Sequence, residues 1–186
     1  IMTKETLNGL LLELIISNEF SGDELLTVTR SLENYLKYIK CTKGAVLRTK
    51  SGSIEILASL PSHTEIDPSW YILAGIIEEK LSKTATVTRE LILDEIIYYS
   101  FKLDGYGYLI LGNEVPLPEE LVNSLGPVAS NLGRALLMIS ELEYLKRSSQ
   151  QMEKLAFVAA KTHDIIIIAD SEGLITYVNK AYEDST

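Results

Sequence analysis

The chain has 186 residues, of which 46% are apolar, and a formal net charge of −9. So much apolar sequence predicts a globular protein rather than a disordered one, and the acidic balance argues against nucleic acid or an anionic membrane as the main partner. A single cysteine, Cys41, excludes an intrachain disulfide and a zinc site built from cysteines, and it fits a reducing cytoplasm. The longest apolar runs are far shorter than the ~18 residues of a membrane-spanning helix. We therefore expect a cytoplasmic chain without direct membrane contact, although its parent protein could be membrane-anchored.

The first third of the chain predicts two helices and a β-hairpin. An amphipathic helix begins after Thr3, and a second one begins at Ser21-Gly-Asp-Glu24, which reads as a capping box with Ser21 as N-cap. Two strands, 45–49 and 54–60, flank a turn rich in glycine and serine.

The middle third predicts a helix followed by strands. Asp67-Pro68 is typical of a helix start, with Asp67 as N-cap and proline in the first helical position. A short strand is expected at 85–88, and a hairpin is expected from strands at 92–103 and 106–111. The first of these strands is apolar on both faces, which predicts a sheet that is covered on both sides.

A long helix is predicted after Pro116 and Pro118. Its apolar residues recur every three or four positions and continue after a one-residue phase slip, a pattern typical of a coiled coil. We expect this helix to leave the domain as a signalling helix and to form a homodimer. The side chains assigned to that role are Leu132, Ala135, Ile139, Leu142, Leu145 and Met152.

The last part of the chain predicts a helix end, a strand at 165–168, a turn at 170–173 and a strand at 174–178. This order, with its Asp-x-x-Gly turn and the Asn-x-Ala-Tyr string that follows, resembles the opening of a PAS domain. The residues that carry the resemblance are Asp170, Gly173, Ile175, Val178, Asn179, Ala181 and Tyr182.

The order helix, helix, hairpin, helix, strands, long helix over residues 5–145 is similar to that of a GAF domain. This resemblance implies an α+β fold, in which an antiparallel sheet has its first and last helices on one face and a ligand pocket under the other. We assign residues 1–135 to a GAF-like sensory domain, 136–160 to a connecting coiled-coil helix and 161–186 to the N-terminal fragment of a PAS domain.

Ligands for a cofactor are scarce in the sequence. His63 could hold haem or a metal, but no second ligand lies at metal spacing, so a solvated loop histidine is the better interpretation. His163 lies at a helix-to-strand turn and lacks the surroundings of a phosphoacceptor histidine. Bilin-binding GAF domains use a cysteine well downstream of Cys41, and GAF-type methionine sulfoxide reductases need several cysteines. The sequence therefore supports no haem, bilin or metal site and leaves the cofactor unknown.

A pocket for a small organic ligand is the remaining hypothesis. Trp70, Tyr71, Tyr98 and Ser100 flank the region where GAF domains hold their ligands, and Asp94 and Glu95 could add polarity. The competing interpretation is that these are ordinary core and surface residues.

The resemblances imply a sensory or regulatory input module of a signal-transduction protein, foremost a two-component sensor histidine kinase, with no catalysis in this chain. Three alternatives stay open. The chain could serve a cyclic-dinucleotide cyclase or a transcription activator, it could be a dimerisation scaffold without a ligand, or it could be an enzyme with a GAF-like fold.

Overall fold

The computed structural model describes residues 4–16, 22–61, 66–82 and 90–185. By their contacts the residues form two compact units, Ile1–Ser140 (unit 1) and Glu141–Thr186 (unit 2). No helix in the described ranges is long and apolar enough to cross a membrane. The predicted boundaries at residues 135 and 160 stay predictions, because the helix α4 (Glu119–Lys161) runs unbroken past the first of them and ends beside the second.

Unit 1 is built on a five-stranded antiparallel sheet. Its strands are β1 (Lys43–Lys50), β2 (Ser53–Leu60), β3 (Glu90–Leu93), β4 (Ile96–Leu103) and β5 (Gly107–Asn113), in the spatial order β2-β1-β5-β4-β3. The two predicted hairpins are confirmed at β1–β2 and β4–β5, where Gly52 and Gly105 take the positive φ that such turns require.

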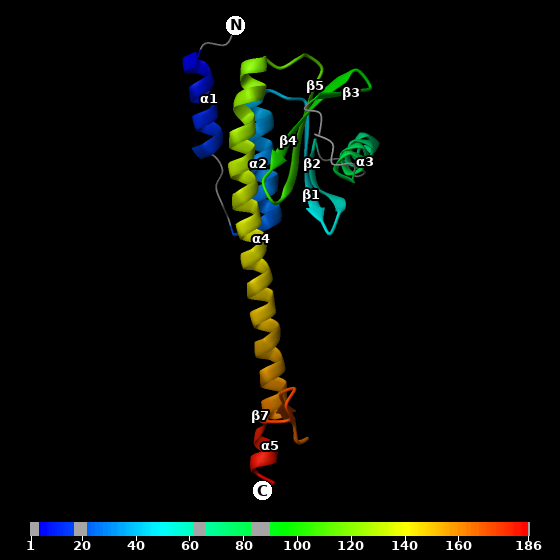
Figure 1. The fold of residues 1–186 in the computed structure, drawn as a ribbon. Coiled ribbons are helices and arrows are strands. Elements are labelled where there is room, and N and C mark those ends of the chain that lie inside the picture. Colours follow the sequence, from blue (N-terminus) through cyan, green and yellow to red (C-terminus); the bar gives the residue numbers. More distant parts are fainter. Residues whose placement is uncertain (1–3, 17–21, 62–65, 83–89, 186) are drawn as a thin grey trace. The chain divides into compact units, whose positions relative to one another are not determined.

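Helices cover both faces of the sheet, as the strand pattern predicts (Figure 1). On one face α1 (Lys4–Ile16), α2 (Glu24–Ile39) and the first part of α4 share a core with alternate residues of β4 and β5. On the other face α3 (Pro68–Ser82) packs on the remaining residues of the same strands. An α+β fold with the first and last helices of the unit on one side of the sheet is therefore confirmed.

One predicted strand is wrong in its extent. The stretch 92–103 is not continuous, because Asp94 and Glu95 form a tight turn that separates β3 from β4. Both turn residues have positive φ, 49° and 64°. Aspartate tolerates this conformation but glutamate rarely adopts it, so the composition of the turn predicts it only weakly. The strand expected at 85–88 lies outside the described residues.

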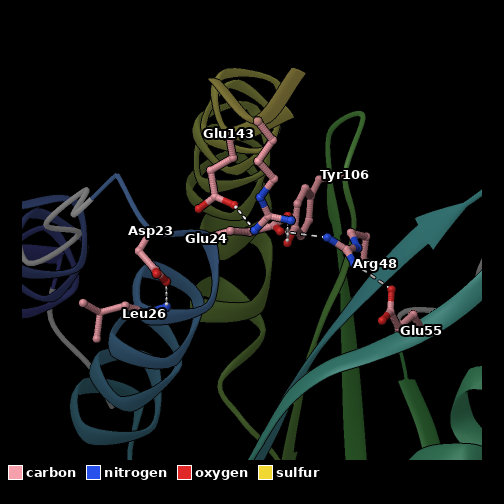
Figure 2. Close-up of polar contacts among 8 residues, drawn as sticks. Asp23, Glu24, Leu26, Arg48, Glu55, Tyr106 and Glu143 are labelled. Atoms are coloured by element: carbon pink, nitrogen blue, oxygen red, sulfur yellow. Dashed lines mark hydrogen bonds and ion pairs between the residues drawn. The ribbon is translucent and has the colours of Figure 1, made fainter. Parts of the chain in front are cut away.

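The start of α2 also differs from the capping box that the sequence indicates. The N-cap is Asp23, whose carboxylate accepts a hydrogen bond of 2.8 Å from the Leu26 amide. Ser21 lies outside the described residues, and Glu24 accepts hydrogen bonds from Arg48 (2.8 Å) and from the Tyr106 hydroxyl (2.9 Å), as Figure 2 shows. Arg48 also donates to Glu55 at 2.7 Å, and the network thus joins α2 to β1, β2 and the β4–β5 hairpin.

The first part of α4 packs closely on the sheet. A Cβ atom at Gly133 would overlap the backbone of Leu103 and Asp104, so the helix backbone lies directly against the end of β4. Only glycine permits so short a separation between the backbones of a helix and a strand.

Unit 2 contains the end of α4, the strands β6 (Ile167–Ala169) and β7 (Ile175–Val178), and the short helix α5 (Lys180–Glu183). The predicted turn is confirmed: Gly173 has φ +84°, and the Asp170 carboxylate accepts hydrogen bonds from the Glu172 and Leu174 amides. β6 begins two residues later than predicted.

Asn179 is the only buried polar side chain among the described residues of unit 2. Its amide group donates to the carbonyls of Ala159 and Asp164 and accepts from the amides of Ile166 and Tyr182. One side chain thereby links the end of α4, the hairpin and α5. The identity of this unit as the start of a PAS domain stays a prediction.

Candidate functional site on the α3 face of the sheet

The α3 face of the sheet holds an aromatic cluster. Trp70 of α3 and Tyr98 of β4 are each 2% exposed, and their rings meet edge to face with centroids 5.6 Å apart. The Tyr98 ring has room because its cross-strand partner is Gly112, where a Cβ atom would lie only 2.9 Å from the ring. The pair supplies the kind of aromatic wall on which small organic ligands are held.

The Tyr98 hydroxyl is the polar group of this cluster. It is buried and no described group lies in good hydrogen-bonding geometry to it, but it lies near the Lys43 ammonium group and helps to raise the pKa of that lysine. A buried hydroxyl without a partner costs free energy, about 1–3 kcal/mol. Such a group is either a tolerated defect of the core or a donor that is kept for a molecule arriving from outside.

Beside the cluster, Lys43 and Asp67 form an ion pair at 2.8 Å between the start of β1 and the start of α3. The hydrogen bond from Lys43, followed by bonds from Ser69, lowers the pKa of Asp67 to about 2. The pKa of Lys43 is raised, chiefly by its hydrogen bond with Asp67. Asp67 also accepts a hydrogen bond of 2.9 Å from the Ser69 amide, which confirms it as the cap of α3.

The structure brings together only part of the predicted pocket. Trp70, Tyr98 and the buried Ser100 lie on the α3 face, whereas Tyr71 is 59% exposed on another side of α3. Asp94 and Glu95 lie in the exposed β3–β4 turn and do not contribute polarity to the cluster. His63 lies outside the described residues. In the described part of this face the space between Trp70 and Tyr98 is filled by their own rings.

The opposite face of β4 connects to α4. Tyr99, the neighbour of Tyr98, points to the other side of the sheet, and its hydroxyl accepts a hydrogen bond of 3.0 Å from the Leu117 amide, two residues before α4 begins. Phe101 and Leu103 follow on the same face within the core shared with α4. β4 therefore touches the α3 cluster on one side and the α4 side of the core on the other.

The residues predicted for the signalling helix divide into two groups. Leu132 is 1% exposed and packs in the core of unit 1, and Ile139 is buried at 7% exposure. Leu142, Leu145 and Met152 are 60%, 61% and 68% exposed, and Ala135 is half-buried. The apolar stripe predicted for dimerisation is thus buried in unit 1 in its first part and exposed in its second.

The other residues weighed for chemistry have ordinary surroundings. Cys41 is buried in the core, and this burial raises the pKa of its thiol to about 12, which disfavours a reactive thiolate. His163 is exposed just after α4. Among the described residues no three His, Cys, Asp or Glu side chains are grouped so that they could hold a metal ion.

Two contacts in this arrangement cannot be predicted from the sequence. Lys43 and Asp67 are 24 residues apart, and nothing in either segment signals that they meet. The link from Tyr99 to Leu117 joins two segments that are 18 residues apart. The alternation of apolar residues along β4 predicts only that Tyr98 and Tyr99 point to opposite faces.

No protein-family model matches the chain, and no curated protein matches it. Among solved structures, the chain is similar to the GAF domain of a protein assigned as a sensor histidine kinase from Pseudomonas syringae pv. tomato. The identity is 18% and the TM-score 0.47, over 74% of this chain and 94% of the other. It is also similar to the LBD domain of VqsR from Pseudomonas aeruginosa, with 16% identity and a TM-score of 0.42, over 73% of this chain and 96% of that one. At TM-scores below 0.5, neither likeness decides the family or the function of this chain.

Proposed function

We propose that the chain is a sensory input module of a signal-transduction protein such as a two-component sensor histidine kinase. In this proposal unit 1 is a GAF-like domain that takes a small molecule on the α3 face of its sheet. A change there reaches α4 through β4 and passes along the helix to unit 2, which we interpret as the start of a PAS domain. The proposal assigns no catalysis to the chain.

The observation that carries the proposal is the position of β4. Its consecutive residues Tyr98 and Tyr99 touch different parts of the unit, the Trp70 cluster on one face and the segment before α4 on the other. At the far end of the strand, the backbone at Leu103 lies against Gly133 of α4. A displacement of Tyr98 by a ligand therefore acts on the strand that packs against α4. Coupling of this kind requires that the strand has two arrangements whose balance the ligand shifts.

The Tyr98 hydroxyl allows a direct test. We expect a native mass spectrum of gently purified protein to show added mass from a bound small molecule. In a Tyr98→Phe variant the added mass should be lost, because the donor for the ligand is gone. The variant should be as stable as the parent or slightly more stable, because the substitution removes a buried hydroxyl without a partner.

Tyr108→Phe is the matched control, because Tyr108 lies on the same face of the sheet in the same cluster. Added mass that survives in Tyr98→Phe at the level of this control would contradict the assigned role of the hydroxyl.

A ligand-free dimerisation scaffold is the second candidate. It is favoured by one observation, the filled space between Trp70 and Tyr98, each of which is 2% exposed. Protein without added mass in either variant, together with dimers in solution, would support the scaffold over the sensor.

A further inference from the structure

One stripe of side chains on α4 in unit 2 follows a strict coiled-coil pattern, and Tyr144, Leu155 and Phe157 are exposed beside it. Leu142, Leu145, Ser149, Met152, Ala156 and Ala159 are separated by three and four residues in strict alternation, and we call this set the seam. All six lie on one stretch of α4, and each is exposed except Ala159, which is half-buried. Repeated 3–4 spacing places such residues on one stripe of a helix and is the pattern that a second helix covers.

The spacing of the seam extends toward the N-terminus without the phase slip that the sequence indicates. Met138, four residues before Leu142, continues the spacing backwards in the sequence and is 65% exposed. Its neighbour Ile139, which was predicted as a dimer contact of the signalling helix, is 7% exposed. The apparent phase slip therefore arises because two adjacent stripes of the helix, one through Ile139 and one through Met138, are both apolar. Leu125, Val128 and Leu132 pack in the core of unit 1 and Ile139 is buried, whereas the stripe that begins at Met138 is exposed.

Charges beside the seam are complementary to those of a second copy. If Leu142 and Leu145 occupy heptad positions a and d, Glu141 is at position g and Lys146 at position e, and both side chains are exposed. In a parallel coiled coil that is in register, a g residue faces the e residue five positions later on the partner helix. Each Glu141 would then face a Lys146 of the other copy, which gives two attractive pairs for each dimer.

We propose that the seam binds the same seam of a second copy of this chain as a parallel, in-register two-stranded coiled coil. The large layers at Leu142, Leu145 and Met152 supply the apolar contact, and the small layers at Ser149, Ala156 and Ala159 let the helices approach. The proposal deepens the proposed function and rests on it for the role of the dimer, which is to carry a change in α4 between two identical chains. It differs from the sequence-based expectation in its residues, because Leu132 and Ile139 take no part.

Cysteine cross-linking of the full chain tests both the face and the direction. In a Cys41→Ala background the new thiol is the only one, and single variants Met138→Cys, Ser149→Cys and Gln150→Cys are compared under mild oxidation on a non-reducing gel. We expect Met138→Cys and Ser149→Cys each to give mainly covalent dimer, because facing core positions of a parallel coiled coil lie within disulfide distance. Gln150→Cys, one residue off the seam, should stay mainly monomeric.

An antiparallel pair centred near Ser149 is the main rival, because it would place Lys146 opposite Glu153. In that arrangement Ser149→Cys cross-links but Met138→Cys does not, and this outcome overturns the proposal. Equal cross-linking of Gln150→Cys and Ser149→Cys overturns it as well, because the contact would then not follow the seam.

Charge reversal gives an independent measurement. Glu141→Lys should raise the dimer dissociation constant, measured by sedimentation equilibrium, by about tenfold, because two attractive pairs become repulsive. The double variant Glu141→Lys/Lys146→Glu should restore the parent value. Lys154→Glu, on the outward side of the helix, is the matched control and should change it little. No effect of Glu141→Lys overturns the parallel register.

Failure of this proposal and failure of the proposed function are distinguishable. A chain that is monomeric at all concentrations but retains ligand mass on the native spectrum overturns the seam and leaves the sensor in place. Cross-linking at Met138 and Ser149 without ligand mass supports the seam while the sensing role fails.

Discussion

The two stretches of α4 show how one helix can serve two different surroundings. Up to Ile139 one apolar stripe of the helix is buried, and Leu125, Leu132 and Leu136 are 0–1% exposed in the core shared with α2 and the sheet. After Ser140 the helix is continuous and still carries large apolar side chains, yet Leu142, Leu145 and Met152 are at least 60% exposed. Amphipathic pattern alone therefore does not tell which partner a helix face has. The difference lies in which of two adjacent stripes is used.

The largest effect should come from Gly133, where α4 touches β4. Gly133→Ala places a Cβ atom onto the backbone of Leu103 and Asp104, which cannot retreat as a flexible side chain can. We expect a loss of about 4 kcal/mol or more in the free energy of unfolding, the range that marks severe overpacking or strain. Urea unfolding followed by far-ultraviolet circular dichroism measures it.

Gly126 of the same helix is the matched control, because a Cβ atom there meets nothing within 4 Å. Gly126→Ala should stabilise the protein by about 0.5–1 kcal/mol through helix propensity. Similar effects of the two substitutions would mean that α4 does not approach β4 so closely.

The next effect separates the two stretches directly. Leu132→Ala removes a side chain that is 1% exposed and should cost about 3 kcal/mol of unfolding free energy. Met152→Ala, at 68% exposure, should change the unfolding of dilute monomer by less than about 0.5 kcal/mol. A large cost for Met152→Ala in the monomer would show that this part of the helix has a partner within its own chain.

A smaller effect should appear in acid and should be confined to unit 1. The pKa of Asp67 is lowered from 3.8 to about 2, so its pairing with Lys43 adds stability above pH ~4, and this contribution is lost as the pH falls toward 2. Because both side chains are partly exposed, at 25% and 30%, solvent screening limits the contribution to about 1 kcal/mol. In an Asp67→Asn variant the unfolding midpoint should therefore fall less steeply as the pH is lowered from 4 to 2. An unchanged slope would contradict the pairing.

The most local effect concerns the link within unit 2. Asn179→Asp keeps the oxygen that accepts from Ile166 and Tyr182 but loses the donors to Ala159 and Asp164. We expect hydrogen exchange near the end of α4 to accelerate by at least about fivefold, because two hydrogen bonds worth about 1 kcal/mol each are lost, with no change in unit 1. Asn131→Asp, on an exposed face of α4 in unit 1, serves as the control. Faster exchange in unit 1 would contradict the separation of the units.

The sequence predicts the local parts of this fold better than the contacts between segments. Asp67-Pro68 marks the start of α3 correctly, because capping depends on neighbouring residues. The β3–β4 turn is missed, because Asp94 tolerates positive φ but is followed by glutamate rather than by glycine. Tyr71 and Trp70 cannot be ranked for burial, since α3 is apolar on several sides.

The predicted stripe of α4 included Ile139 instead of Met138 for the same reason. Met138 and Ile139 are adjacent and both apolar, so the sequence offers either one as the next member of a stripe. Only the folded structure decides between them, because Ile139 is 7% exposed and Met138 is 65% exposed. The Lys43–Asp67 pair likewise depends on how β1 and α3 meet, and no periodicity encodes that.

The position of Trp70 determines what can be observed optically in this protein. It is the only tryptophan of the chain, it is buried in unit 1, and the Tyr98 ring lies against it. Its emission is therefore a built-in reporter of the α3 face, and a shift in wavelength or intensity reads the state of that cluster without any label. Unit 2 contains no tryptophan, so a change in the hairpin or the seam leaves the tryptophan emission unchanged. Emission and circular dichroism recorded side by side thus assign each event to its unit.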